Sequence, residues 1–412
     1  MTSTGTARFA QPAMLIAAVI LALVLVANVL FTYVVFTRPF PGFNDYLTVW
    51  EGARAYFYDG LDPYSPATSL RIQTRIYGRA ALPDEQPNHF AYPFYAVFFV
   101  YPFIHFEYAF ATALWVVFLE CCLIAAALLA FNLYRWRPRP TTVMAVALLA
   151  VFCYPGARGL FLGQVSHLVY LLQALALWAT VKDRDRLAGV ALALSSFKPQ
   201  MGILFIPLLL LWALYQRRWR LLSAFGITLA LLVGASFVLL PEWVAGFWTQ
   251  VRLYPAYIEV STPAWVITQY WLNLGSGAEI AVNLVAYAGV LWTWVALRQH
   301  PERFLWTVML ALTVTHVVGP RTASPHFIVF MLPLLFYLHQ MTQRRMGWRM
   351  LLLMVALVLV PWLHFLLTIS PTKFEHPTVF LPLPLLNLAA LLMTRTLWWK
   401  VHAQQLKLSP TP

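Results

Sequence analysis

Long runs of apolar residues, separated by short groups of polar or basic residues, recur along the whole chain. A helix that crosses a membrane needs about 20 predominantly apolar residues, and the first run, from about Pro12 to Thr37, exceeds this length. Three longer stretches are interrupted by proline or glycine, which end helices, and we interpret them as helical hairpins. The pattern predicts an all-α integral membrane protein with about twelve membrane-spanning helices.

The composition supports this class and excludes an ordinary soluble protein. The 412 residues are 61% hydrophobic and only 10% charged, whereas soluble domains carry about 25% charged residues. We expect a single polytopic membrane domain over residues 1–412, because no repeat or low-complexity tract divides the chain. The first apolar run is too long for the core of a signal peptide, so we interpret it as a retained first span.

The net charge of +13 is better explained by the membrane than by nucleic acid. Basic residues gather in short clusters between apolar runs, as they do in cytoplasmic loops, and no nucleic-acid-binding motif accompanies them. The clusters are Arg135, Arg137 and Arg139; Lys182, Arg184 and Arg186; Arg217, Arg218 and Arg220; Arg298 and Arg303; Arg344, Arg345 and Arg349; and Lys400 with Lys407. Placing them all inside predicts a plasma (inner) membrane protein with both termini in the cytoplasm.

This orientation turns three apolar stretches into hairpins whose apices face outward. The apices are expected at residues 156–164, 195–199 and 319–325, where glycine and proline interrupt the helices. Two outer loops are long, residues 38–106 and 242–277, and both are rich in Trp and Tyr, as segments at a membrane surface tend to be. We expect interfacial helices in the first loop. Its apolar end, residues 92–106, is interpreted as an interfacial or re-entrant helix that gives a lipid access to the protein.

Several polar residues stand at the predicted outer ends of the helices, but spacing alone does not fix their roles. Asp45 follows the first span and is either a catalytic carboxylate or, like Asn44, the cap of the next helix. The hairpin apices add Arg158, Gln164, Lys198, Arg321 and His326. Ionisable groups at such positions are functional-site hypotheses. The alternatives are that the arginines reach lipid headgroups, that Lys198 binds carbonyl groups and that Gln164 links two helices.

Other residues are weaker candidates for a site. Glu120 and His167 are minor possibilities, whereas His316 lies deeper in its span and is more typical of helix packing. The histidines show no metal-ligand spacing, and the chain has no glycine-rich phosphate loop or serine-hydrolase motif. Nucleotide-driven transport and serine hydrolysis therefore lack support, and we expect no metal and no other cofactor.

Four blocks of sequence, in this order, resemble glycosyltransferase family 87. They are Asp45 with Glu51-Gly-Ala-Arg-Ala, Asp59-Gly-Leu-Asp62-Pro-Tyr64 and Phe90-Ala-Tyr92-Pro93-Phe94; Gly163-Gln164; Ala188-Gly189 leading to Phe197-Lys198-Pro199; and Ser324-Pro325-His326 before a Leu-Pro helix. The resemblance covers roughly residues 45–335. The chain departs from the family at one place, because some members have paired histidines where only His326, followed by Phe327, stands here.

The resemblance implies an inverting membrane enzyme of the GT-C superfamily with an outward-facing active site. The donor would be a polyprenyl-phosphate sugar, most simply of mannose, and the acceptor a glycolipid or glycan of the cell envelope. The implied site residues are Asp45 and His326 for catalysis, Lys198, Arg158 and Arg321 for donor phosphate, and Gln164, Tyr92 and Tyr64 for substrate contacts. These residue types suit the roles, because an acceptor hydroxyl needs a base and a departing phosphate needs cations.

A transporter or flippase of lipid-linked sugars is the competing class. Such a protein would show related halves and helices broken near the middle of the membrane. The sequence has no internal repeat, and its polar residues gather at the predicted ends of helices. A catalytically inactive, lipid-binding member of the family also stays open.

Overall fold

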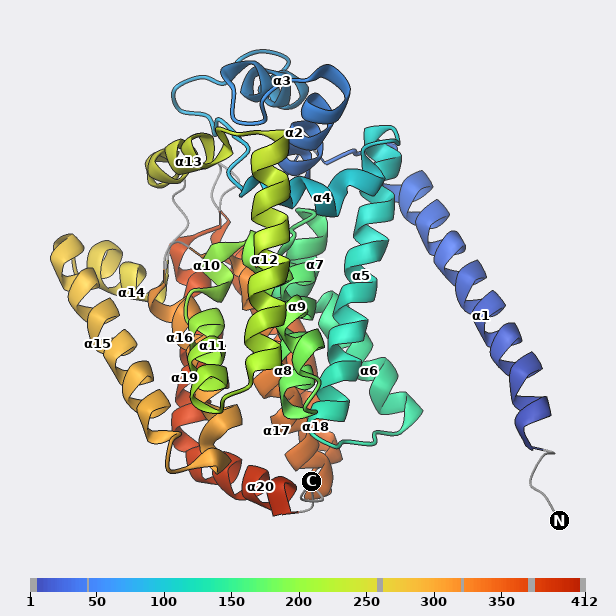
Figure 1. The fold of residues 1–412 in the computed structure, drawn as a ribbon, viewed down its shortest axis with the longest axis vertical. Helices are drawn as coiled ribbons and strands as arrows, with labels where there is room; N and C mark the ends of the chain where they lie inside the picture. The colour runs from blue at the N-terminus through green and yellow to red at the C-terminus, as the bar shows by residue number, and fades with distance from the viewer. Residues whose placement is uncertain (1–5, 43, 258–261, 320–321, 370–374, 408–412) are drawn as a thin grey trace.

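Helices make up most of the protein and run mainly along one common direction (Figure 1). The computed structural model describes residues 6–42, 44–257, 262–319, 322–369 and 375–407. Within these residues there is no strand, which confirms the predicted all-α class.

The α-helices are α1 (Thr6–Phe31), α2 (Asp45–Asp59), α3 (Pro66–Tyr77), α4 (Val97–Val100), α5 (Tyr108–Leu133), α6 (Pro140–Phe152), α7 (Tyr154–Phe161), α8 (Ser166–Val181), α9 (Asp185–Leu194), α10 (Pro199–Gly202), α11 (Phe205–Tyr215), α12 (Trp219–Leu239), α13 (Trp243–Tyr257), α14 (Pro263–Trp265), α15 (Gly275–Ala296), α16 (Phe304–Val318), α17 (Met331–Gln343), α18 (Gly347–Thr368), α19 (Pro382–Met393) and α20 (Arg395–Lys407). The π-helical turns are η1 (Thr32–Thr37) and η5 (Val266–Trp271), and the 3-10 turns are η2 (Phe94–Ala96), η3 (Tyr101–Phe103), η4 (Ser195–Phe197), η6 (Pro301–Arg303), η7 (Ser324–Phe330) and η8 (Pro377–Phe380).

Five helical segments in the described part of the chain are long and apolar enough to cross a membrane. They are Met14–Thr37, α5, α12, α15 and α18. The number rises to seven if two bent pairs each form one span, namely α6 with α7, bent by 55°, and Pro377–Met393 with Arg395–Gln404, bent by 63°. The membrane class is therefore supported, whereas the twelve crossings stay a prediction. They would require shorter helices such as α8 and α11 to act as spans.

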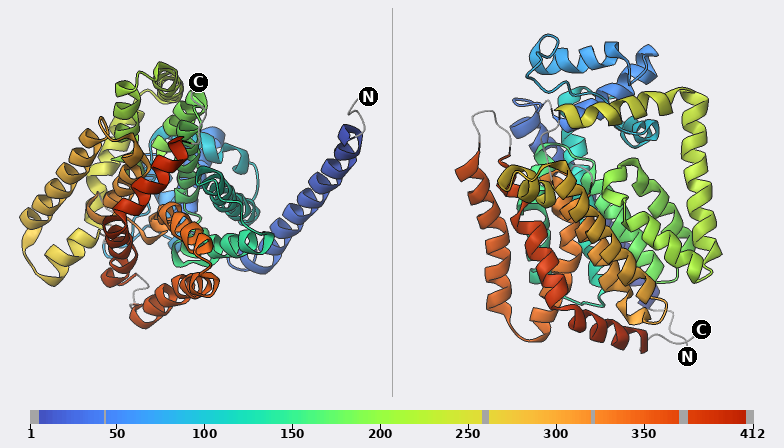
Figure 2. Two further views of the ribbon diagram at one scale, coloured as in Figure 1. Left: turned by 90° about the horizontal axis from the view of Figure 1, so that it is seen from below. Right: turned by 90° about the vertical axis from the view of Figure 1, so that its left-hand side faces the viewer.

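The two ends of the helical bundle differ in charge. The turns that carry the basic clusters lie at the same end as α20 and the start of α1, whereas α2 and α3 lie at the opposite end (Figures 1 and 2). The clusters were expected on one side of a membrane, and the fold gathers them at one end.

The three expected hairpin apices are breaks between helices. The short helix α7 and a turn occupy the first, η4 and α10 occupy the second, and η7 occupies the third. Pro199 begins α10 and Pro325 lies in the first turn of η7, as expected of a residue that cannot continue a preceding helix. The predicted positions of these breaks are confirmed.

The first long loop contains two well-formed helices, α2 and α3. The side chain of Ser65 caps α3, and Gly60, in the left-handed conformation at φ 65°, ends α2. Glu51 of α2 is fully buried and binds Arg71 at 2.9 Å and Arg75 at 2.6 Å, both from α3. These ion pairs hold α3 against α2 at the end of the bundle.

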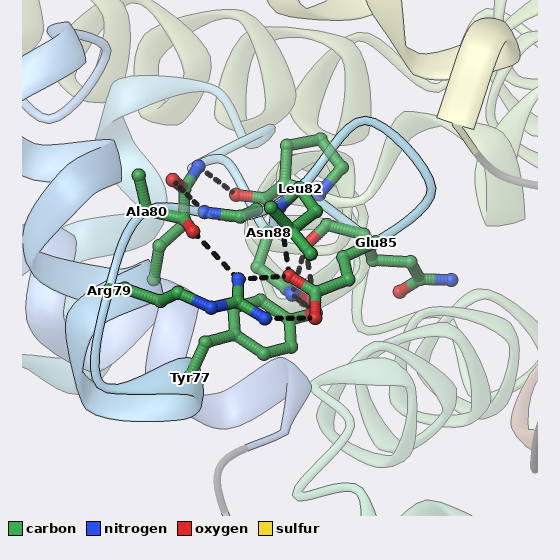
Figure 3. Close-up of polar contacts among 10 residues, drawn as sticks. Tyr77, Arg79, Ala80, Leu82, Glu85 and Asn88 are labelled. Atoms are coloured by element: carbon green, nitrogen blue, oxygen red, sulfur yellow. Dashed lines mark hydrogen bonds and ion pairs between the residues drawn. The ribbon is translucent and has the colours of Figure 1, made fainter.

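The stretch after α3 is ordered by a local network of polar contacts (Figure 3). The Arg79 guanidinium donates two hydrogen bonds to the Glu85 carboxylate, at 2.7 and 2.8 Å, and the backbone N–H of Leu82 donates to the same carboxylate at 2.8 Å. Asn88 donates to the Gln86 carbonyl at 2.8 Å. The contacts join residues close in sequence, so they fix the shape of this exposed loop.

The apolar end of the first loop forms three consecutive short turns, η2, α4 and η3, lying beside α2 near the end of the bundle (Figure 1). Phe94, Val97 and Val100 are fully buried there. The segment therefore packs α2 against the other helices of the bundle.

Candidate active site

Asp45 is available for chemistry because its neighbour caps the helix. The Asn44 side chain accepts a hydrogen bond from the backbone N–H of Tyr46 at 3.3 Å and donates one to the carbonyl of Phe161 at 2.6 Å. The cap of α2 is therefore Asn44. The Asp45 carboxylate, in the first turn, instead accepts a hydrogen bond from the amide of Gln164.

Gln164 reaches Asp45 because a glycine precedes it. Gly163 has φ +58°, and a Cβ there would lie 2.5 Å from Cβ of Tyr46. Tyr46 stacks on Trp115 with ring centroids 5.0 Å apart, and the Trp115 indole donates to the Gly163 carbonyl at 2.8 Å. Only glycine fits this left-handed position and this close approach, so the turn places Gln164 against the start of α2.

Lys198 completes a chain of three polar side chains. It lies at the break between η4 and α10, is 3% exposed, and donates through its ammonium to the carbonyl oxygen of Gln164. One amide thus faces a carboxylate with its NH₂ group and an ammonium with its oxygen. Three segments far apart in sequence meet at this point.

The protonation of Asp45 depends on these neighbours. Burial raises the pKa of the Asp45 carboxyl above its ordinary value, while the Lys198 ammonium and the Gln164 hydrogen bond oppose this rise. The side chain nevertheless keeps part of its surface exposed. A partly exposed carboxylate with a raised pKa is a better proton acceptor than an ordinary surface aspartate.

A second charged group borders the first. Arg158 of α7 lies 3.4 Å from the carboxylate of Glu375, which also accepts hydrogen bonds from the hydroxyls of Tyr154 and Ser324. Arg158 and Glu375 both lie close enough to Asp45 to influence its pKa, in opposite directions. Glu375 was not predicted from the sequence, although its position close after an apolar run offered a signal.

His326 and His316 face each other across a threonine. The Thr322 hydroxyl lies 3.1 Å from Nδ1 of His326 and 3.0 Å from Nδ1 of His316. The backbone N–H of Ala323 donates to Nδ1 of His326 at 3.1 Å. Both Nε2 atoms are buried and have no hydrogen-bond partner within the described residues. His316, expected only to pack helices, therefore belongs to the candidate site.

His167 has a larger structural role than the other two histidines. Its Nε2 bonds the Gly156 carbonyl at 2.9 Å, and a Cβ at Gly159 would lie 2.2 Å from its ring. The ring thus fills a gap against α7. Lys198 lies close enough to His167, His316 and His326 for its charge to act on all three. Its ammonium is therefore a point where several elements meet: α7, α8, α16, η7 and the α10 break.

Tyr64 and Tyr92, two further predicted site residues, contact each other within the first loop. Tyr64 is 7% exposed and donates to the carbonyl of Tyr92 at 2.7 Å, so its hydroxyl is engaged inside the first loop. The loop approaches the centre through Tyr95, whose hydroxyl lies 3.2 Å from that of Ser196. Substrate contacts by Tyr64 and Tyr92 stay predictions. Arg321 lies outside the described residues.

The site brings together a carboxylate, two histidines, a buried lysine and a partly exposed arginine in a many-helix membrane protein. Such a set of ionisable groups is typical of a membrane enzyme that acts on a charged substrate. The sequence profile of glycosyltransferase family 87 matches residues 90–320, more than half of the chain. The chain belongs to glycosyltransferase family 87, and it is accordingly a membrane glycosyltransferase.

The matched region includes part of the candidate site. Gln164 and Lys198 lie within it, whereas Asp45, His326 and Glu375 lie outside. No curated protein and no solved structure matches the chain. The roles of individual residues must therefore be argued from their chemistry in this structure.

Proposed function

We propose that the protein transfers a sugar, most simply mannose, from a polyprenyl-phosphate donor to a lipid-linked or glycan acceptor at the outer face of the plasma membrane. The observation that carries the proposal is the linkage of Asp45 to Lys198 through Gln164. It brings a proton acceptor and a cation to one place, as transfer from a sugar phosphate to a hydroxyl group requires.

In the proposed reaction, the acceptor oxygen attacks C1 of the donor sugar while the hydroxyl proton passes to Asp45. The bond between C1 and the phosphate oxygen breaks, and its electron pair leaves with the polyprenyl phosphate. A single displacement inverts the configuration at C1. Because a phosphate is a weak base, its departure needs no general acid.

The leaving phosphate is proposed to bind Lys198 and Arg158, with Arg321 as a further ligand. Lys198 is almost fully buried, and a buried ammonium is costly unless an anion lies near it. Asp45 supplies part of that compensation, and a donor phosphate would supply more. Arg158 offers a planar guanidinium of the kind that binds phosphate oxygens well.

His326 is proposed to orient a substrate beside Asp45. Because the Ala323 N–H donates to Nδ1, a neutral His326 ring carries its proton on Nε2, the buried atom that has no partner among the described residues. An Nε2–H group is a donor and cannot accept a proton. This tautomer favours Asp45 as the base and gives His326 the role of hydrogen-bond donor to a substrate oxygen.

The outward orientation rests on the basic turns at the end opposite α2 and α3, because such clusters favour the cytoplasm. It is tested in intact cells with a membrane-impermeant thiol reagent. A cysteine at Asp84 should react and one at Arg220 should not, with the wild-type chain and its three free cysteines as background. Labelling of Arg220→Cys with no labelling of Asp84→Cys would reverse the orientation.

The activity is tested with purified protein and a panel of radiolabelled polyprenyl-phosphate sugars, followed by mass spectrometry of the product. We expect transfer from the mannosyl donor and product of inverted configuration. Nucleotide sugars serve as the control, and we expect no transfer from them. Transfer from nucleotide sugars alone would overturn the proposed donor class, and transfer of another sugar would overturn the choice of mannose.

A further inference from the structure

A pocket of about 470 Å³ lies between the first helix and the rest of the protein. Its walls come from the end of α1 with η1, from α5, and from α6 with α7, and its main apolar side chains are Phe31, Phe36, Val116, Phe152, Leu160 and Phe161. Its volume is within the range of about 300–1,000 Å³ typical of ligand sites.

The pocket owes its existence to the way α1 leaves the bundle. Along most of its length α1 stands away from the other helices (Figures 1 and 2), and in Met14–Thr37 the apolar window contains no buried residue. Near its end, Asn28 donates to Glu120 of α5 at 2.7 Å, and Thr37 donates to the Ala109 carbonyl at 2.7 Å. The pocket therefore lies between two candidate membrane spans.

The chemistry of the walls favours a hydrocarbon over a sugar. The polar side chains in the walls already bond to the protein: Asn28 to Glu120, Thr37 to a carbonyl, and Thr112 to the Tyr108 carbonyl at 2.8 Å. The remaining wall is mostly apolar and aromatic. Burying the hydrocarbon chain of a lipid against such a surface is favourable. The same surface offers few groups to orient sugar hydroxyls.

The pocket borders the segments that carry the candidate site. Asn44 and Ala157 both line it, and their sequence neighbours are Asp45 and Arg158. Asn44 also bonds the carbonyl of Phe161, another wall residue. A lipid whose phosphate lies at Arg158 and Lys198 can therefore place the adjoining part of its chain in this pocket.

We propose that the pocket holds the phosphate-proximal isoprene units of the polyprenyl donor. This inference rests on the proposed function and adds the place where the donor chain binds. The sequence suggested the apolar segment 92–106 for lipid access. The fold instead buries Phe94, Val97 and Val100 of that segment completely and opens the described pocket beside α1.

The test uses a sugar-free polyprenyl phosphate with a photoreactive diazirine on its third isoprene unit. We expect crosslinks in residues 28–40 and 112–120, and competition by unlabelled polyprenyl phosphate but not by phosphatidylglycerol. Val116→Trp fills the pocket and should reduce crosslinking by about tenfold or more, the loss expected from about 1.4 kcal/mol of binding free energy.

The matched control is Leu128→Trp, which introduces the same side chain into the same helix at a residue that is 51% exposed and outside the pocket. It should leave crosslinking unchanged. Crosslinks elsewhere, or an equal effect of both variants, would overturn the inference. Equal competition by phosphatidylglycerol would also overturn it by identifying ordinary membrane lipid as the occupant.

The crosslinking result is independent of sugar transfer. If the probe labels the pocket but no polyprenyl-phosphate sugar is a donor, the proposed function fails and the lipid site stands. If transfer proceeds while the probe labels another region, the lipid site fails and the proposed function stands.

Discussion

Two polar clusters lie near the same end of the protein and differ in almost every physical respect. Arg79 and Glu85 are six residues apart, form two direct hydrogen bonds of 2.7 and 2.8 Å, and leave the Arg79 side chain 47% exposed. Asp45, Gln164 and Lys198 come from three distant segments, and Lys198 is 3% exposed. The first cluster shapes a loop, whereas the second joins the parts of the bundle.

The difference shows that close ion-pair geometry does not by itself mark a functional site. The ion pair of Arg79 and Glu85 is exposed, so water and salt screen it and it contributes little to stability. Burying charges costs several kcal/mol before their attraction is counted. A fold that buries Lys198 almost completely beside a half-buried Asp45 accepts that cost. Ionisable groups whose pKa values are shifted by burial gather at functional sites.

The largest expected effect is the loss of the Asp45 charge. Asp45→Asn should lower turnover by about a hundredfold or more, as loss of a general base does, with folding and donor binding intact. The measurements are kcat with the mannosyl donor and thermal stability in detergent. Asn44→Ala is the contrasting variant, because it removes the cap of α2 and should act mainly on stability. Near-normal turnover of Asp45→Asn would remove Asp45 from catalysis.

Loss of the buried cation should come next. Lys198→Met should reduce kcat/KM for the donor by about tenfold or more, because a cation that stabilises a leaving phosphate is lost. It should also move the acidic limb of the pH profile upward. Lys198 lowers the Asp45 pKa, so without it the carboxylate becomes protonated at higher pH and activity falls sooner on acidification. An acidic limb at the same pH in both proteins would contradict the link between the two residues.

A smaller effect is expected from the turn that carries Gln164. Gly163→Ala places a Cβ 2.5 Å from Tyr46 and a non-glycine residue at φ +58°, which costs about 1–2 kcal/mol from the left-handed conformation alone. Stability and kcat should both decrease. Gly60→Ala is the matched control, since its φ is +65° but nothing lies within 4 Å of its Cβ. Equal loss of kcat in both variants would show that the contact with Tyr46 does not matter.

The smallest effect is expected in the exposed cluster. Glu85→Gln removes the ion pair with Arg79 but keeps a side chain that can accept the Leu82 N–H, so kcat/KM should change by less than about twofold. The same steady-state assay measures it. A loss comparable to that of Lys198→Met would mean that the exposed loop takes part in substrate binding.

Local features of the fold were predictable from the sequence. Pro199 and Pro325 marked helix breaks, because proline acts through its own backbone. The choice of Asn44 over Asp45 as the cap was not predictable, since both residue types cap helices. It depends on the Phe161 carbonyl, which is 117 residues away.

The site was predicted only in part, because its residues could be recognised one by one but their contacts could not. Asp45, Gln164 and Lys198 were named separately because each is unusual where it stands in an apolar chain, but their contact depends on three-dimensional packing. Glu375 was missed, and His316 was assigned to helix packing, because their importance comes from Arg158 and Thr322 beside them. The number of about twelve spans stays a prediction, because length and composition alone do not assign short helices such as α11 as spans.

The amide of Gln164 has a consequence for the movement of protons. Carboxylates and imidazoles can relay a proton, but a side-chain amide neither gains nor loses one near neutral pH. Gln164 therefore does not relay protons between Asp45 and Lys198, although it forms a hydrogen bond with each. A proton taken up by Asp45 cannot pass through it to the phosphate site and must leave toward the partly exposed side of the carboxylate. Each turnover would then end with a proton released to solvent, separately from the departing lipid.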